Sequence, residues 1–466
     1  MELPAVLSPI ANSKKFNLNA SAVAGFFGGE EAITAMATVH LYRGRRWLGW
    51  YNSPGSYIIA KEFGRISRSR FWNGLFPGSS HHDPAVAFRL DGKTGPKYVA
   101  SHSGTVMQQT GHLAHLLTQG TDHSVVPPML LPSARDATTS LISIVTVPDI
   151  NYDNLSMQTI RISNHHAVLA SFPILVSVGT CILSALFADW YCFAMIFLGI
   201  ISSGVTCFVI GSGDLDIETV KTPAEGSPVG DGMLLINNNV FILKGKEKDV
   251  NVITKGKFVL KLKGKPEYTA IGLCSLLLEV QFLLQLLLIP QGSLIGQTMF
   301  LTSIIASWAY NSFLASLDEE KLQRKLFYDT IKLRQPAVLS FKASTRTIMA
   351  VFTCFVLCED IQRPLQGVEP MNILLELVPN ETPVWQKWRE QVVAQVKKKK
   401  EGETIDFQSG NVDMLVGLDD HDKTLLANLL QDAEDAYKGY TTQRRATTLH
   451  PTFTATMGIE LHNFNM

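Results

Sequence analysis

The chain has few cysteines, and they lie where structural disulfides are not expected. Only six of its 466 residues are cysteine. All six fall in apolar segments, and the rest of the chain has none: Cys181, Cys192, Cys207, Cys274, Cys354 and Cys358. This placement excludes the kind of disulfide framework that stabilises small secreted domains.

An excess of charge and a recognisable catalytic motif are also missing. Lys plus Arg and Asp plus Glu number 41 each, so the net charge indicates no partner, and nucleic acid is not expected. The histidine pairs His81-His82 and His112-x-x-His115 lack the Cys or Glu spacing that would complete a metal site. No nucleophile and base stand out as a pair. The sequence therefore assigns no catalytic residue, no metal and no cofactor.

What the chain does have is two long apolar runs, Ala167 to Gly211 and Ala270 to Leu317. The 45 residues of the first would form an unbroken helix of roughly 67 Å, about twice the ~30 Å hydrocarbon core of a bilayer. The run must therefore fold back. We expect the break at Ala188-Asp189, because Asp189 is the only charge in the run, and this gives spans over residues 167–187 and 190–211.

The second run breaks at Pro290-Gln291-Gly292, where a proline that cannot donate to the helix is followed by a glycine. The spans are then 270–289 and 293–317. The sequence predicts a membrane protein with four transmembrane α-helices arranged as two helical hairpins. The alternative is four core helices of a large soluble protein, but paired apolar stretches of about 20 residues are rare in soluble folds.

Positive charge predicts the orientation of the hairpins. The connection Ser212 to Glu267 carries nine lysines, whereas the two hairpin tips carry no Lys or Arg. The positive-inside rule then places the N-terminal region, the connection and the C-terminal region in the cytosol. The sequons at Asn19, Asn154 and Asn380 would stay unglycosylated in this topology.

The regions outside the spans give three expected cytosolic parts. Residues 1–160 are predicted to be β-rich, residues 212–267 to form a β-meander, and residues 318–466 to be α+β. The expected strands of the first two parts are 38–42, 47–51, 57–60, 141–147, 157–162, 233–236, 240–243, 250–253 and 258–262. The third part is expected to hold helices from Pro383 to Lys400 and from Asp420 to Lys438, a strand at 412–416, and a buried element at 347–358.

Glu279 is the strongest single candidate for a functional residue. It lies in the middle of the third span, where an ionised carboxylate costs at least ~2.5 kcal/mol, so it must be protonated, paired or facing water. Counting from the turn puts Gln285 level with Gln297 and Glu279 level with Ser303, which predicts cross-hairpin hydrogen bonds. Further polar candidates within the spans are Gln281, which shares a face with Gln285, and Asn311. Structural hydrogen bonding and a role in transport both remain open.

Small residues at four-residue spacing predict close helix packing. They are Gly199, Ser203, Cys207 and Gly211 in the second span, with Gly292 and Gly296 at the start of the fourth. Such stripes let helix backbones approach one another. We expect contacts within the four-helix bundle, with a homodimer face as the alternative.

The second hairpin also carries a resemblance. The residues Pro290-Gln-Gly-Ser-Leu-Ile-Gly-Gln-Thr-Met-Phe, continuing through Ser307-Trp-Ala-Tyr-Asn-Ser to Leu317-Asp-Glu-Glu, resemble a family of uncharacterised multi-pass membrane proteins of mushroom-forming fungi. The resemblance implies a membrane location but no activity. It covers only this hairpin.

These patterns favour a structural or interaction component of a membrane. The expected partners are the lipid bilayer and cytosolic proteins, with a homo-oligomer left open. A transporter or channel subunit that uses Glu279 is the second hypothesis, and a membrane-bound enzyme is the third.

Overall fold

The structure is a computed structural model, and it divides into two compact units, each with its own packing. It describes residues 25–67, 70–77, 83–119, 128–133, 139–152, 155, 157, 159–161, 164–219, 227, 229–262, 268–333, 338–359, 370–401, 404–407 and 418–449. The helical unit comprises residues 1–92, 153–218 and 257–330. The sheet unit comprises residues 93–152, 219–256 and 331–466.

The helical unit is built on four long helices. They are α8 (Asn164–Leu186), α9 (Trp190–Ile210), α11 (Thr269–Leu288) and α12 (Leu294–Ala315). Shorter elements complete the unit: α3 (Gly29–Leu41), η1 (Arg45–Trp47), α4 (Ser56–Ile66), α5 (Arg70–Leu75), α6 (Pro84–Ala87), η4 (Ile289–Gln291) and α13 (Glu319–Ile331). Two small ladders join β1 (Tyr42–Arg43) to β6 (Ile160–Arg161) and β7 (Asp214–Glu218) to β10 (Lys257–Lys261).

Three helices are long and apolar enough to cross a membrane: Val168–Leu186, Trp190–Ile210 and Thr269–Gln291. A fourth is counted when α12 is taken together with α13, to which it is joined by a 52° bend. The breaks between the long helices fall at residues 187–189 and 289–293, where the sequence predicts them.

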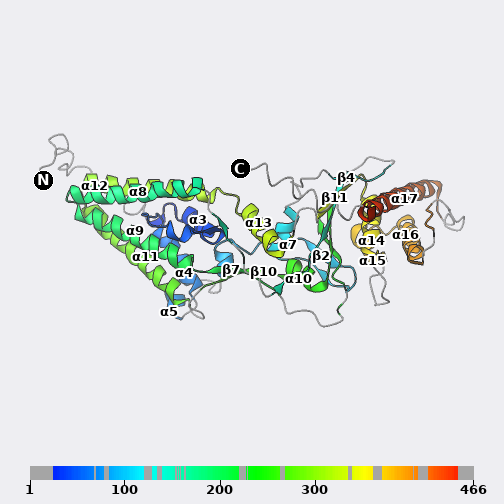
Figure 1. Cartoon of the computed structure of the whole chain (residues 1–466), viewed down its shortest axis with the longest axis horizontal. Helices are drawn as coiled ribbons and strands as arrows, with labels where there is room; N and C mark the ends of the chain where they lie inside the picture. Colours follow the sequence, from blue (N-terminus) through cyan, green and yellow to red (C-terminus); the bar gives the residue numbers. More distant parts are fainter. Residues whose placement is uncertain are drawn as a thin grey trace. The chain divides into compact units, whose positions relative to one another are not determined.

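Six helices of the helical unit pack in a cyclic order that we call the ring, and α9 also packs directly against α12 and α3 across it. In order around the ring they are α8, α9, α11, α4, α3 and α12, and each packs against the next. Figure 1 shows α3 lying between the arm that contains α8 and α12 and the arm that contains α9 and α11. We call residues 44–55, which include η1 and lead to α4, the inner loop; Trp47 near its start is exposed, residues 51–55 are buried, and Asn52 lies between α8 and α12.

The predicted strands at 38–42, 47–51 and 57–60 are wrong, because this region is helical apart from the inner loop and the two-residue β1. The sequence of α3 is rich in alanine and has Glu30 and Glu31 in its first turn, which suits a helix. The β-branched and aromatic residues at the start of α4 suggested a strand. They are instead accommodated by packing of α4 on α11, and tertiary packing overrides intrinsic propensity in this way.

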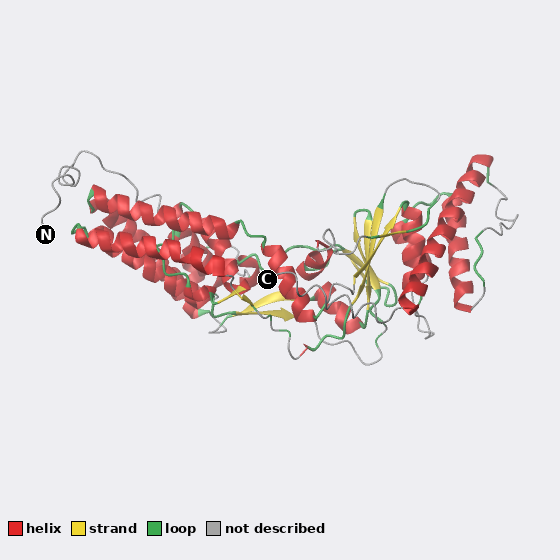
Figure 2. Ribbon diagram, turned by 45° about the horizontal axis from the view of Figure 1, so that its top comes forward, coloured by secondary structure: helices red, strands yellow, loops and turns green. Residues whose placement is uncertain are grey.

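The sheet unit is centred on seven strands in the order β3-β2-β8-β9-β5-β11-β4. Their bounds are β2 Lys97–Ala100, β3 Val106–Met107, β4 Met129–Leu130, β5 Ser140–Thr146, β8 Gly232–Ile236, β9 Asn239–Lys244 and β11 Val338–Ala343. The helices are α7 (His112–Gln119), α10 (Glu247–Lys255), α14 (Arg346–Leu357), α15 (Pro370–Leu377), α16 (Pro383–Glu401) and α17 (Asp420–Leu449). A core of buried apolar residues joins the sheet to α14 and the helices beyond it, which lie on one side of the sheet (Figures 1 and 2).

Several predictions for these regions need correction. The strand expected at 250–253 is wrong: these residues lie in α10, where Glu247 and Asp249 in the first turn and Lys255 in the last suit a helix. The central residues form no meander, because β10 pairs with β7 and not with β9. Helix α17 does not stop at Gly439 but continues to Leu449. The strand expected at 157–162 is reduced to β6, and the one at 412–416 lies outside the described residues.

Candidate functional site

The interior of the ring holds a polar cluster centred on Asn52 of the inner loop. The backbone N–H of Asn52 donates to Ser177 Oγ at 3.0 Å, and its Nδ2 donates to Ser303 Oγ at 2.8 Å. Ser177 lies near the middle of α8 and Ser303 near the middle of α12. Asn52 is fully buried. The inner loop therefore carries an amide to the midpoint of the long helices.

The small-residue stripe of α9 receives the inner loop. A Cβ added at Gly199 would lie 1.9 Å from Asn52 Oδ1, so only glycine leaves room for this amide. One turn on, Ser203 Oγ donates to the carbonyl of Gly49 at 2.9 Å. Cys207 packs directly against Gly49, and Gly211 packs against Arg46. The predicted stripe does allow a close approach, but the element that approaches is a loop rather than a second helix.

At the far end of the inner loop, Arg45 is buried without a carboxylate partner. It is 4% exposed, its Nη2 lies 3.5 Å from Tyr51 Oη, and its guanidinium lies 5.3 Å from the centroid of the Tyr310 ring. Tyr51 Oη donates to Asn311 Oδ1 at 2.8 Å, and Asn311 Nδ2 donates to Ser53 Oγ at 3.4 Å. The Nε and Nη1 atoms of Arg45 have no hydrogen-bond partner. A buried guanidinium held by one tyrosine hydroxyl and one tyrosine ring makes this end of the ring electropositive.

The two hairpin tips are joined by Asp189. Its Oδ1 accepts the N–H of Cys192 at 3.1 Å and so caps α9, while its Oδ2 accepts both the N–H and the Oγ–H of Ser293 at 2.6 and 2.7 Å. Gly296, predicted as a helix-packing residue, makes room for this carboxylate: a Cβ there would lie 1.9 Å from Asp189 Oδ2. Gly292 packs against Cys192 and Asp189 in the same way.

The predicted polar residues of α11 and α12 do not pair as expected. Glu279 is half-buried, and its Oε2 has no partner. Ser303 bonds Asn52 rather than Glu279, and Gln297 Nε2 donates to the carbonyl of Gly292 at 3.1 Å. Both amide atoms of Gln285 lack a partner, so the expected Gln285–Gln297 bond is not formed. The two glutamines at 281 and 285 are each 1% exposed and face inward.

Sequence reasoning missed Asn52 and Arg45, which organise the interior. The one available signal was Ser53-Pro54-Gly55, a turn motif that follows Asn52. A turn at this position between two apolar-patterned segments is compatible with a hairpin of strands or of helices. Only the stripe on α9, about 150 residues away, decides between them.

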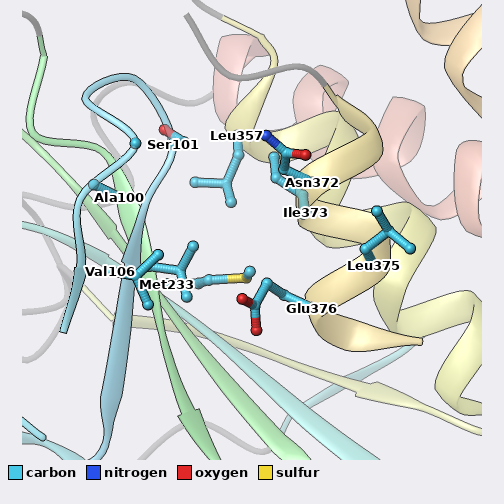
Figure 3. A pocket seen from close by; sticks show the side chains of 11 residues that line it. Ala100, Ser101, Val106, Met233, Leu357, Asn372, Ile373, Leu375 and Glu376 are labelled. Atoms are coloured by element: carbon cyan, nitrogen blue, oxygen red, sulfur yellow. The ribbon is translucent and has the colours of Figure 1, made fainter. Parts of the chain in front are cut away.

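The sheet unit has a cavity of about 370 Å³ between β2, β3 and the helices α14 and α15. Figure 3 shows the side chains of Met233, Leu357 and Glu376 pointing into it from different elements. The rim is held by an ion pair in which Lys97 Nζ lies 2.6 Å from Glu376 Oε2. Ser101 and Asn372 add polar groups to a wall that is otherwise mostly apolar.

A second polar cluster of the sheet unit surrounds Glu359. Its carboxylate lies 3.1 Å from Lys244 Nζ and 3.3 Å from Arg444 Nε, and it accepts Tyr440 Oη–H at 2.8 Å. Lys399 lies over the Tyr440 ring, 3.8 Å from its centroid, and burial lowers the pKa of Lys399 to about 8. These contacts tie α14, α16 and α17 to the end of β9.

Neither the grouping of side chains in the described ranges nor the comparisons with known proteins indicate a metal site or a reaction. Within the described ranges, no three His, Cys, Asp or Glu side chains are grouped so as to hold a metal ion. The rings of His112 and His115 lie 6.0 Å apart, and His81 and His82 fall outside those ranges. No protein-family model, no curated protein and no solved structure matches the chain.

Proposed function

We propose that the chain is a multi-pass integral membrane protein whose two helical hairpins each cross the bilayer twice. The observation that carries the proposal is the distribution of polarity in the helical unit. Apolar side chains cover the outer surface of the long helices, including Phe172, Leu175, Ile182, Leu186, Leu273, Val280, Leu283, Leu287 and Ile305. Polar side chains are buried inside, including Ser177, Ser184, Ser202, Gln281, Gln285, Gln297, Ser303 and Asn311. A soluble fold has the opposite arrangement, whereas a bundle in lipid requires this one.

The sheet unit gives independent support for an even number of crossings in each hairpin. Its central strand β5 precedes α8 in the chain, β9 lies between the two hairpins, and β11 follows α12. The pairing of β5 with both β9 and β11 supports a location of these three chain segments on one side of the membrane. Each hairpin would then enter and leave on that side, which favours four spans over three.

The excess of lysine in the connection supports a cytosolic location for that side and for both termini. The test is glycosylation mapping of the full chain in microsomes. A sequon-containing tag inserted after Gln291 should be glycosylated, whereas the native sequon at Asn380, which is exposed, should not. Modification of Asn380, or protection of the sheet unit from added protease in sealed vesicles, would reverse the orientation.

We propose further that the sheet unit makes this protein a structural or interaction component of its membrane. The cavity beside Glu376 and its exposed apolar neighbour Leu375 support this role, since they offer a mixed apolar and polar site for a partner. Glu376→Lys should remove a specific co-purifying component, identified by mass spectrometry. The matched control Glu390→Lys, at an exposed position of α16, should retain it. Retention by both variants would contradict a role for the cavity.

A transporter or channel subunit is the second candidate, and the buried polar cluster around Asn52 favours it. Glu279 lies at the edge of the ring rather than inside it. If Glu279 carries transport, Glu279→Gln should abolish solute flux in proteoliposomes without changing folding. If the interior carries transport, the same variant should keep its flux, and Asn52→Leu should lose it.

A further inference from the structure

Exposed aromatic side chains of the helical unit lie at two levels along helix α9. At the hairpin tips, Trp190 and Tyr191 are 64% and 46% exposed. At the opposite end, which we call the base, Trp47 is 54% exposed, and its ring lies 4.8 Å from that of Phe208 near the end of α9. Phe208 follows Trp190 by 18 residues, a rise of roughly 27 Å. This separation is close to the ~30 Å hydrocarbon core of a bilayer, whose two headgroup levels tryptophan and tyrosine prefer.

Helix α5 adds a second exposed aromatic group at the base. Its Trp72 packs against Gly272, three residues after the start of α11, where an added Cβ would lie 2.4 Å from the indole ring. The neighbouring Phe71 and Leu75 are 62% and 50% exposed. Because the two hairpin tips are joined and α9 packs against α11, the end of α9 and the start of α11 lie together at the base.

Arginines accompany these aromatic side chains at the base, whereas the hairpin tips carry no Lys or Arg. The guanidinium of Arg46 lies 5.6 Å from the ring centroids of both Trp47 and Phe208. Arg43, two residues before η1, and Arg70, the first residue of α5, are both exposed. Within the described ranges, these three arginines make no ion pair. Their charge is therefore available to a ligand.

The carboxylates of this region do not cancel that charge. Three of them pair with other basic side chains: Glu62 with Arg65, Asp216 with Lys261 and Glu218 with Lys257. Asp214 at the start of β7 is exposed and offsets one of the three arginines. The acidic residues 318–320 follow the end of α12. The base therefore keeps an excess of positive charge beside α9 and α11.

We propose that Arg43, Arg46 and Arg70 bind the headgroups of anionic lipids around the base of α9 and α11. The inference rests on the membrane location proposed above and adds the class of lipid. A guanidinium binds phosphate and carboxylate oxygens in pairs and can stack on an aromatic ring at the same time, as Arg46 does on Trp47. Basic residues near an anionic membrane surface gain affinity from its negative potential. The exposed rings beside the arginines contact the upper acyl chains of the same lipids.

The test is native mass spectrometry of the full chain, released from detergent micelles that contain equal amounts of phosphatidylserine and phosphatidylcholine. The wild-type protein should retain several-fold more phosphatidylserine. Each basic residue near an anionic surface contributes roughly fivefold in affinity, so the triple variant Arg43→Gln, Arg46→Gln, Arg70→Gln should lower phosphatidylserine retention by about tenfold or more. The matched control replaces three exposed lysines of the sheet unit and should keep the wild-type preference: Lys342→Gln, Lys397→Gln and Lys398→Gln.

A double variant, Arg43→Gln with Arg70→Gln, guards against misfolding, because both side chains are exposed and make no ion pair within the described ranges. It should lose part of the preference. Equal retention of the two lipids by the wild type, or an unchanged preference in the folded double or triple variant, would overturn the proposal.

Two further measurements separate the possible sources of a negative result. Glycerophosphoserine, which has no acyl chains, should not compete at the same concentration as phosphatidylserine. Competition would indicate a site for soluble anions and would overturn the lipid assignment. Protein that floats with liposomes but shows no lipid preference overturns this inference alone. Protein that does not float with them contradicts the membrane location as well.

Discussion

Asp189 Oδ2 accepts two hydrogen bonds from Ser293, one from its N–H at 2.6 Å and one from its hydroxyl at 2.7 Å. The two residues are 104 positions apart and belong to different helical hairpins. Each also caps its own long helix, since Asp189 Oδ1 accepts from Cys192 N–H and Ser293 Oγ from Gly296 N–H. One carboxylate thus fixes the start of α9 and the register of α12 against it.

Asp189→Asn should therefore destabilise the helical unit. The neutral amide gives up charge-assisted bonds that are worth about 1.5–3 kcal/mol each, and we expect a loss of that order in the free energy of unfolding measured in detergent. A double-mutant cycle with Ser293→Ala isolates the contact. Additive losses would mean that the two residues are not coupled.

Gly199→Ala should destabilise the chain because the new methyl group would overlap Asn52 Oδ1. Overpacking of this kind costs about 1–3 kcal/mol, more than the ~1 kcal/mol that alanine gains over glycine in a helix. Gly179→Ala on α8 is the control, since a Cβ there meets nothing within 4 Å. It should leave the melting temperature unchanged or raise it. Equal effects at both positions would argue against a tight contact at Asn52.

His40 should make stability depend on pH. It is 3% exposed, and its burial lowers its pKa to about 4 from an ordinary 6.5. The unfolded chain binds a proton between these values and the folded chain does not, so stability should fall as the pH drops from about 6.5 toward 4, by on the order of 3 kcal/mol. Melting curves across this range test it. His40→Leu should flatten the curve, and His421→Leu, at an exposed position of α17, should not.

In the sheet unit, Glu359→Gln should cost more stability than Glu376→Gln. Burial opposes the ionisation of Glu359, yet Lys244, Tyr440 and their neighbours hold its pKa below the ordinary value. The ionised Glu359 carboxylate therefore adds to the free energy of unfolding above pH 4.5, and this contribution is lost as the pH falls below that value. We expect a loss of about 1–3 kcal/mol at neutral pH, against less than about 1 kcal/mol for Glu376, which pairs with the partly exposed Lys97. Chemical denaturation of the two variants gives the comparison.

The long helices and their breaks could be predicted from the sequence because the residues that determine them lie within or next to each helix. The length of each apolar run indicates that it forms two helices, and Asp189 and Pro290 interrupt the two runs where the helices end. The same holds for α16, which begins at the predicted Pro383. In each case the deciding residues lie inside the element or next to it.

The inner loop and the ring could not be predicted from neighbouring residues in the sequence. Residues 57–59 are Tyr-Ile-Ile, a run that favours a strand by propensity, yet they lie in the first turn of α4 because α4 packs on α11. Likewise, the stripe of small residues from Gly199 to Gly211 indicates that another element packs closely against α9, but it does not identify that element. Partners far away in the sequence decide both cases.

The seven-stranded sheet has a consequence for the synthesis of the chain. Strand β5 ends at Thr146, but its partner β11 ends at Ala343, after both hairpins have been made. At about 5–20 residues per second, β5 waits roughly 10–40 s for this neighbour. During that interval this edge of β5 is unpaired while the apolar helices are being synthesised, and an unpaired edge can pair with other chains. Completion of the sheet is therefore a late event that follows synthesis of both apolar hairpins, and a chain truncated before Val338 would keep that edge open.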